Sequence, residues 1–167
     1  MSSYKRGKAF VYEWIRNNTP VGATCLDVGA CNGVWCKNLR DHLKMDAIEI
    51  FQPNIIKHKL ADIYANVYNE DVRIFQYGDY HIIIFGDVLE HMTVEEAQQC
   101  LRYSENHSKI VIVAVPFLYE QAPFDGNEYE RHIQPDLTRE LVKERYPELN
   151  ELLIFDEYGY YFWRAET

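Results

Sequence analysis

The segment CLDVGACNG (residues 25–33) joins a short apolar run to a turn that contains two glycines. Residues 24–28 form a predicted buried strand, and Asp27 places an acid near its end. Gly29 and Gly33 allow the backbone to turn tightly and a ligand to approach closely. Because ligands of open α/β sheets bind at the carboxyl ends of the strands, this segment predicts a ligand site within such a sheet.

Patterns of strand and helix alternate along the rest of the chain. The predicted strands are residues 24–28, 47–50, 65–68, 81–85 and 110–115, and the predicted helices include residues 10–15, 35–43, 53–63, 93–101 and 135–146. Residues 152–155 and 160–163 flank Gly159 and predict a terminal hairpin. Strands that alternate with helices, followed by a hairpin, indicate an α/β sheet that is mostly parallel.

The composition is that of a compact protein with a sizeable core. The chain has 167 residues, of which 47% are hydrophobic, and no repeat or linker divides it, so we expect one domain over residues 1–167. Its net charge of -9 disfavours binding to duplex nucleic acid. No signal peptide or membrane-spanning run is recognised, so we expect a cytoplasmic protein with reduced cysteines and no membrane partner.

The glycine-containing turn does not match a dinucleotide-binding fingerprint. The pattern GxGxxG starting at Gly29 would require glycines where the chain has Cys31 and Val34. No Lys or Arg occurs in residues 22–35, so a phosphate ligand is disfavoured. Glu49 follows Asp27 at close to the spacing of about 20 residues at which a carboxylate meets ribose hydroxyls in nucleotide-binding α/β folds. These features favour a ribose-containing ligand without phosphates.

Four segments in order resemble the class I S-adenosylmethionine-dependent methyltransferases: CLDVGACNG, DAIEIFQP around Glu49, residues 69–72, and IIIFGDVLEHM. The resemblance covers about two thirds of the chain. It implies a Rossmann-like three-layer α/β sandwich, whose mostly parallel seven-stranded sheet ends in the antiparallel hairpin, and an EC 2.1.1-type transferase. It also implies S-adenosyl-L-methionine as cofactor and S-adenosyl-L-homocysteine as product. Cys31 departs from the family, which usually has a third glycine there.

The resemblance implies a cofactor site in residues of about 20–92. Its implied members are Asp27, Gly29, Ala30, Asn32, Gly33, Glu49, Ile50, Phe51, Asp71, Val72, Gly86, Asp87 and Val88. Asp27 is expected to face the methionine ammonium group, and Glu49 to accept hydrogen bonds from the ribose hydroxyls. Asp71 and Val72 are expected at the adenine amino edge, and residues 86–88 near the sulfonium.

The stretch of about residues 117–134 is too long for an ordinary connection, and it is where we expect the acceptor to bind. Its predicted substrate-binding residues are Phe117, Tyr119, Tyr129, Arg131 and His132. Residues 127–132 are similar to a segment after the fifth strand of many small bacterial methyltransferases, and His132 is a candidate general base. Asp87 and His91 are the other candidate catalytic residues. No metal site is expected, although Asp87, His91 and His132 could converge in space.

The expected function is methyl transfer to an oxygen or nitrogen atom of a small molecule, glycan end or natural product, by a monomer or homodimer. The alternative is a noncatalytic scaffold or subunit of the same fold, which Cys31 favours and the acids Asp27, Glu49 and Asp71 disfavour. A nicotinamide-dependent reductase is disfavoured, because the GxGxxG fingerprint is missing. Gly86 to Leu89 also lack the Pro-Pro-aromatic motif of DNA amino-methyltransferases.

Overall fold

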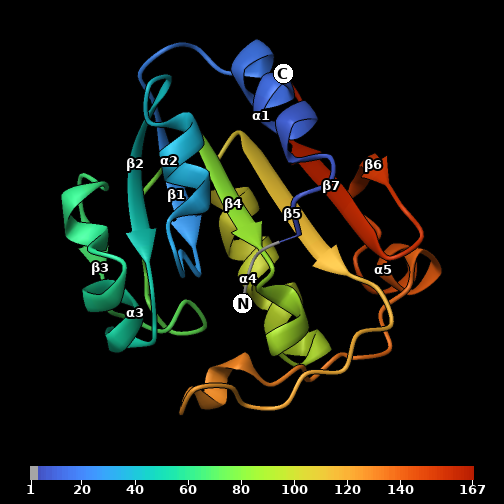
Figure 1. The fold of residues 1–167 in the computed structure, drawn as a ribbon. Coiled ribbons are helices and arrows are strands. Elements are labelled where there is room, and N and C mark those ends of the chain that lie inside the picture. Colours follow the sequence, from blue (N-terminus) through green and yellow to red (C-terminus); the bar gives the residue numbers. More distant parts are fainter. Residues whose placement is uncertain (1–3) are drawn as a thin grey trace.

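The computed structural model describes residues 4–167, which form one seven-stranded sheet covered by helices on both faces (Figure 1). The strand order is β3-β2-β1-β4-β5-β7-β6, in which β7 runs antiparallel to β5 and β6 while the other pairings are parallel. The expected Rossmann-like α/β sandwich, with a mostly parallel sheet and a C-terminal antiparallel hairpin, is confirmed.

The strands are β1 (Ala23–Val28), β2 (Leu43–Ile48), β3 (Val67–Tyr68), β4 (Ile82–Gly86), β5 (Ile110–Pro116), β6 (Asn150–Ile154) and β7 (Tyr158–Arg164). The α-helices are α1 (Lys8–Asn18), α2 (Val34–Leu39), α3 (Gln52–Lys57), α4 (Val94–Asn106) and α5 (Arg139–Arg145). Three short 3-10 helices are η1 (Leu60–Asp62), η2 (Leu89–His91) and η3 (Glu128–Glu130). None of the helices described in residues 4–167 combines the length and the apolar character needed to cross a bilayer.

Strands β4 and β5 are apolar at every position because this part of the sheet is buried on both faces. In β4, Ile82 and Ile84 join a core cluster that contains residues of α1 and α2, whereas Ile83 and Phe85 join the cluster of α4 and α5. Successive side chains of a strand point to opposite faces, so an unbroken apolar run fills both cores. Figure 1 shows the resulting three layers, with α1 and α2 in front of the sheet and α4 behind it.

The predicted helix over residues 35–43 was wrong at its end. Helix α2 ends at Leu39, and Leu43 is the first residue of β2, which the sequence pattern predicted at residues 47–50. Leu43, Met45 and Ala47 are buried at alternate positions, which is the period of a strand. The polar residues between them hid this alternation from a search for continuous apolar runs.

Other predicted boundaries also differ from the structure. The helix expected over residues 53–63 is two pieces, α3 and η1, and the strand expected at 65–68 contains only Val67 and Tyr68. Helix α5 begins after Thr138, whose side chain accepts a hydrogen bond from the Leu141 N–H, and not at Pro135.

Gly159 lies inside β7 and not in the hairpin turn, which contains residues 155–157. A Cβ atom at Gly159 would come within 2.6 Å of both the Phe117 and the Tyr161 rings. The glycine therefore serves the close packing of aromatic side chains against the strand.

The parallel strands end along one edge of the sheet and bring distant segments together. Four segments lie at the carboxyl ends of these strands: the turn after β1, Glu49 after β2, residues 86–88 at the end of β4, and Phe117 after β5. The connection from β5 to α5 passes beyond the arrowheads of β4 and β5 (Figure 1). This edge is where the sequence predicts the ligand site.

Candidate active site

A cavity of about 820 Å³ opens at this edge of the sheet and is large enough for a nucleoside-sized ligand beside a second small molecule. Most of the predicted cofactor residues line it: Gly29, Ala30, Asn32, Glu49, Ile50, Asp71, Val72, Gly86, Asp87 and Val88. All predicted catalytic and acceptor residues also line it: His91, Phe117, Tyr119, Tyr129, Arg131 and His132. Three predicted residues are not among its lining: Asp27, Gly33 and Phe51.

The turn after β1 approaches the cavity through residues in the left-handed backbone region. Gly29 has a φ of 68° and Gly33 a φ of 72°, and a Cβ atom on Gly29 would lie 2.7 Å from Val88 Cγ2. Cys31 adopts a φ of 47° although it is not glycine. Its backbone N–H donates a hydrogen bond of 2.8 Å to Glu49, which ties the turn to the end of β2.

Glu49 presents a buried carboxylate to the cavity, with 4% of its surface exposed. Its Oε2 accepts the Cys31 N–H and its Oε1 accepts the Phe51 N–H, both at 2.8 Å. Burial raises the pKa of Glu49, and these backbone donors oppose that effect. The Asn54 side chain also donates to this carboxylate, which offers about four acceptor sites in all, so Glu49 keeps acceptor capacity for a ligand hydroxyl.

Asp27 does not face the cavity, contrary to the sequence-based expectation. Leu26 and Val28 pack in the core on the α4 side, whereas Asp27 shares the opposite face of β1 with Cys25, under α1 and α2. Its carboxylate accepts a hydrogen bond from the Tyr64 hydroxyl. Burial raises the pKa of Asp27 to about 7. Asp27 is therefore a buried acid on the α1 and α2 side of the sheet, hydrogen-bonded to Tyr64.

Gly33 and Phe51 also lie away from the large cavity. Gly33 is the N-cap residue of α2, and a Cβ atom there would lie 2.5 Å from the Ile63 side chain. Phe51 lines a neighbouring hollow of about 120 Å³ instead. The expected contacts of these two residues with a cofactor are thus not supported by their positions.

Asp71 lines the cavity, but its carboxylate already has a strong partner. The Arg73 guanidinium donates to both of its oxygens, with Nη2 2.7 Å from Oδ2. Partial burial acts to raise the pKa of Asp71, but the hydrogen bonds and charge of Arg73 outweigh it and lower that pKa. A hydrogen bond from an adenine amino group to the Asp71 carboxylate remains a prediction.

At the end of β4, the chain turns sharply into the cavity. A Cβ atom on Gly86 would overlap the Trp35 indole ring, and Asp87 has a left-handed φ of 58°. The Tyr158 hydroxyl donates a hydrogen bond to the Asp87 carboxylate. Sequence reasoning missed Tyr158, because it lies in the terminal hairpin, which is distant in sequence and was interpreted only as core.

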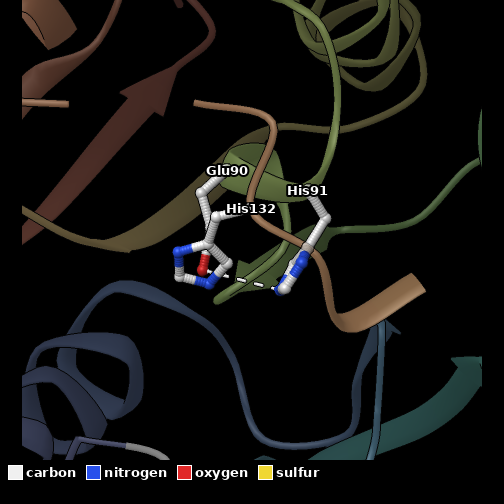
Figure 2. Close-up of side chains that lie close together, drawn as sticks. All are labelled: Glu90, His91 and His132. Atoms are coloured by element: carbon white, nitrogen blue, oxygen red, sulfur yellow. Dashed lines mark ion pairs between the residues drawn. The ribbon is translucent and has the colours of Figure 1, made fainter. Parts of the chain in front are cut away.

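Glu90, His91 and His132 converge at one side of the cavity, with their ligand-type atoms all within 4.8 Å of one another. Figure 2 shows the three side chains pointing toward one another, two from η2 and one from the connection between β5 and α5. Burial, reinforced by the negative charge of Asp87, raises the pKa of Glu90 well above its usual range. Glu90 was not a predicted site residue, although its position beside His91 after a buried strand was an available signal.

The connection between β5 and α5 forms one wall of the cavity through aromatic side chains. Tyr119 and Tyr129 are 45% and 49% exposed, so they present rings at the cavity mouth. The connection is held internally by a hydrogen bond of 3.0 Å from the His132 N–H to the Gln121 carbonyl. These residues are positioned to contact a ligand that enters beside the strand ends.

Comparisons with known proteins agree with this architecture. No family model matches the chain, and no curated protein matches it. An S-adenosylmethionine-dependent methyltransferase from Clostridium acetobutylicum is similar in structure with a TM-score of 0.73 and 14% identity, over 99% of this chain and 93% of the other. The N-methyltransferase NodS from Bradyrhizobium japonicum has a TM-score of 0.68 and 9% identity, over 97% of this chain and 96% of the other.

A third similar structure contains ligands. The 1,6-didemethyltoxoflavin-N1-methyltransferase from Burkholderia thailandensis, with bound 1,6-didemethyltoxoflavin and S-adenosylhomocysteine, has a TM-score of 0.68 and 12% identity. The match covers 97% of this chain and 79% of the other. At these identities the likeness shows the fold, and the chain has the class I methyltransferase fold.

Proposed function

We propose that this protein is an S-adenosylmethionine-dependent methyltransferase that methylates an oxygen or nitrogen atom of a small molecule, glycan end or natural product. The observation that carries the proposal is the buried Glu49 carboxylate, which lies in a large cavity beside the tight turn after β1. Solved structures of the same fold, such as the 1,6-didemethyltoxoflavin-N1-methyltransferase, contain S-adenosylhomocysteine. The fold and the buried acid together favour a nucleoside-containing cofactor.

The charge of the cavity fits a cationic cofactor. Its acidic lining residues are Glu49, Asp71, Asp87, Glu90, Glu96, Glu128, Glu130 and Glu157, whereas Arg73 and Arg131 are the arginines. A sulfonium and an ammonium group are stabilised by such a surplus of carboxylates, and a phosphate would be repelled. The acceptor capacity that remains on the Glu49 carboxylate suits a ribose hydroxyl.

When bound, the cofactor supplies a methyl group on a positively charged sulfur. The acceptor lone pair would form the new carbon–oxygen or carbon–nitrogen bond, and the electron pair of the broken carbon–sulfur bond would stay on sulfur. The chain's own contribution is to hold the acceptor in line with this bond and to keep water out. The aromatic rings of Phe117, Tyr119 and Tyr129 provide an apolar surface for a small acceptor.

His132 is the candidate general base that the sequence predicts on the acceptor side of the cavity. Burial lowers its pKa, so the ring is neutral near pH 7. Its Nδ1 lies 2.7 Å from the Tyr119 carbonyl oxygen, which can only accept a hydrogen bond, so Nδ1 carries the proton. The lone pair at Nε2 is therefore the group able to take a proton from an acceptor.

Calorimetric titration with S-adenosylhomocysteine tests the proposal, with NADH as the negative control. We expect saturable binding of the first ligand only. Glu49→Gln should weaken it about 5-fold to 100-fold, because a charged acceptor of two hydrogen bonds is lost. Glu105→Gln is the matched control, since Glu105 is a partly buried acid outside the cavity lining and should leave affinity unchanged. Absence of binding at millimolar ligand would overturn the proposal.

A further inference from the structure

The Glu90 side chain is the least satisfied polar group in the cavity. It is 1% exposed, and within residues 4–167 neither carboxylate oxygen has a hydrogen-bond partner. His91 Nε2 lies 3.9 Å from Oε1, which is beyond hydrogen-bond distance (Figure 2). A buried carboxylate without hydrogen bonds strongly destabilises the folded chain unless it is neutral or a cation binds it.

The backbone around Glu90 is held firmly in this position. Its carbonyl oxygen accepts hydrogen bonds from the Ile133 N–H at 2.8 Å and the Gln134 N–H at 3.0 Å. These two bonds join η2 to the segment that directly follows His132. The acid and the histidine, which are distant in sequence, are therefore kept together by the backbone and not by contact between their side chains.

Both histidine rings are oriented by a hydrogen bond from Nδ1 to a backbone carbonyl. His91 Nδ1 lies 3.1 Å from the Arg131 carbonyl oxygen, and His132 Nδ1 lies 2.7 Å from the Tyr119 carbonyl oxygen. Since a carbonyl oxygen only accepts, each Nδ1 carries a proton, and in the neutral ring the lone pair then lies on Nε2. A backbone carbonyl that orients a ring in this way is the usual support of a metal-binding histidine.

We propose that Glu90, His91 and His132 bind a divalent first-row transition-metal cation through one carboxylate oxygen and two Nε2 atoms. Two imidazoles and one carboxylate form a donor set typical of Zn²⁺ and other transition ions, whereas Mg²⁺ and Ca²⁺ prefer oxygen ligands throughout. The Asp87 carboxylate lines the same cavity and adds negative charge near the cation. This assignment replaces the sequence-based expectation that the chain has no metal site.

The geometry requires a small movement on binding. Ligand atoms about 2.1 Å from one ion lie about 3.0 to 3.4 Å apart, so a separation of up to 4.8 Å must shorten by an ångström or more. The two rings meet edge to face, with centroids 4.8 Å apart. Side-chain rotations of Glu90 and His91 bring the donors together without moving the backbone hydrogen bonds that hold them.

The cation would determine the class of acceptor, and this part of the inference rests on the proposed function. Three protein donors would leave coordination positions that open into the cavity, and an oxygen atom of the acceptor would bind there. A hydroxyl-bearing acceptor is then favoured over an amine. With the cation bound, the Nε2 lone pair of His132 is used by the cation, so the general-base role described above applies only to the metal-free protein.

Titration of metal-free wild-type protein with Co²⁺ and Zn²⁺ tests the site. Mg²⁺, which prefers oxygen ligands, is the comparison ion. We expect Co²⁺ to develop visible d–d absorption at one equivalent, Zn²⁺ to compete with it, and Zn²⁺ to raise the Tm. Glu90→Gln and His132→Asn should each weaken Co²⁺ binding at least about tenfold. The asparagine can still donate to the Tyr119 carbonyl, and the glutamine keeps the volume of the acid.

His107→Asn is the matched control, because His107 also bonds through Nδ1 to an acid, Asp79, at 2.8 Å but lies outside the cavity lining. It should bind Co²⁺ as the wild type does. The site is overturned if the wild type binds neither Co²⁺ nor Zn²⁺, if Mg²⁺ binds more tightly than Zn²⁺, or if Glu90→Gln retains wild-type binding.

S-adenosylhomocysteine titrations of the same metal-free samples separate the two proposals. Binding of this ligand without binding of any ion overturns the cation site and leaves the methyltransferase proposal standing. Binding of Co²⁺ without binding of S-adenosylhomocysteine overturns the methyltransferase proposal and leaves the cation site standing. A Tm of Glu90→Gln at or above that of the metal-free wild type shows that this variant folds, because it removes an unpaired buried acid.

Discussion

The Tyr158 hydroxyl donates a hydrogen bond to the Asp87 carboxylate and so connects the terminal hairpin to the turn that enters the cavity. Tyr158 is 2% exposed and stacks on Tyr4 with ring centroids 4.4 Å apart. Asp87 has a left-handed φ of 58°. The hairpin, which lies far from the glycine turn in sequence, thereby helps to fix a residue at the centre of the candidate site.

Tyr158→Phe should lower the free energy of unfolding by about 1–3 kcal/mol, because the ring contacts remain while the partly buried Asp87 carboxylate loses a hydrogen-bond donor. Urea denaturation at pH 7 measures this loss. The control is Tyr160→Phe, which removes a hydroxyl that donates to the neutral Arg6 carbonyl at 2.9 Å and should cost about 1 kcal/mol. Equal losses in the two variants would contradict the special role of the Asp87 charge.

The raised pKa of Asp27 predicts that the free energy of unfolding declines as the pH rises. Its folded pKa of about 7 lies above the ordinary value of 3.8, so the folded state holds the proton more tightly than the unfolded state does. The stabilising contribution is complete below about pH 4 and is lost as the pH rises through about 7. For this fully buried group, the free energy of unfolding should fall by roughly a few kcal/mol over this range.

Asp27→Asn should flatten that decline, since the amide oxygen still accepts the Tyr64 hydroxyl and no proton is released. Urea denaturation between pH 4 and pH 8 compares the two slopes. Asp46→Asn is a matched control, because Asp46 also accepts a tyrosine hydroxyl, that of Tyr80 at 2.8 Å, but is only half-buried. A wild-type slope in Asp27→Asn would show that the pH dependence has another source.

Cys31 should tolerate glycine but not a β-branched residue. At a φ of 47°, Cys31→Gly relieves backbone strain while it increases the entropy of the unfolded chain, so the net change should stay within about 1 kcal/mol. Cys31→Val should destabilise the protein by more than about 1 kcal/mol, because β-branched residues strongly disfavour this region. Cys31→Ala isolates the effect of the thiol. If chemical denaturation shows that the Cys31→Val variant is more stable than the Cys31→Gly variant, the left-handed backbone conformation of residue 31 is contradicted.

Gly86→Ala should lower stability by about 1–3 kcal/mol or more, because the new methyl group overlaps the buried Trp35 indole. Gly78→Ala is the control, since nothing lies within 4 Å of a Cβ atom at that exposed position. It should change stability by no more than about 0.5 kcal/mol. Thermal denaturation of the two variants side by side checks the difference, and a stable Gly86→Ala protein would mean that Trp35 is free to move.

The sequence predicted the sheet because its central strands carry strong local signals. The apolar runs of β4 and β5 and the turn after β1 are recognisable without any tertiary information. The boundaries of β2 and α5 were wrong because they depend on burial of alternate residues and on the Thr138 cap, which compete with other local patterns. Local sequence does not reveal which of these alternatives the tertiary packing selects.

The candidate site was predictable where its residues directly follow strands, as Glu49 and residues 86–88 do. Asp27 was misplaced because one position along a strand exchanges the two faces of a sheet. Tyr158 and Glu90 were missed for a different reason. Their importance arises from partners distant in sequence, namely Asp87 for Tyr158 and His132 for Glu90, and only the folded chain brings these together.

The most direct test of the proposed function is a crystal structure of the protein grown with S-adenosylhomocysteine. We expect the ligand in the cavity at the carboxyl ends of β1, β2 and β4, with both ribose hydroxyls within hydrogen-bond distance of the Glu49 carboxylate. The turn of residues 29–33 should enclose its amino-acid portion. Ligand bound elsewhere, or a cavity that contains only solvent at saturating ligand, would contradict the proposal that this cavity is a methyltransferase active site.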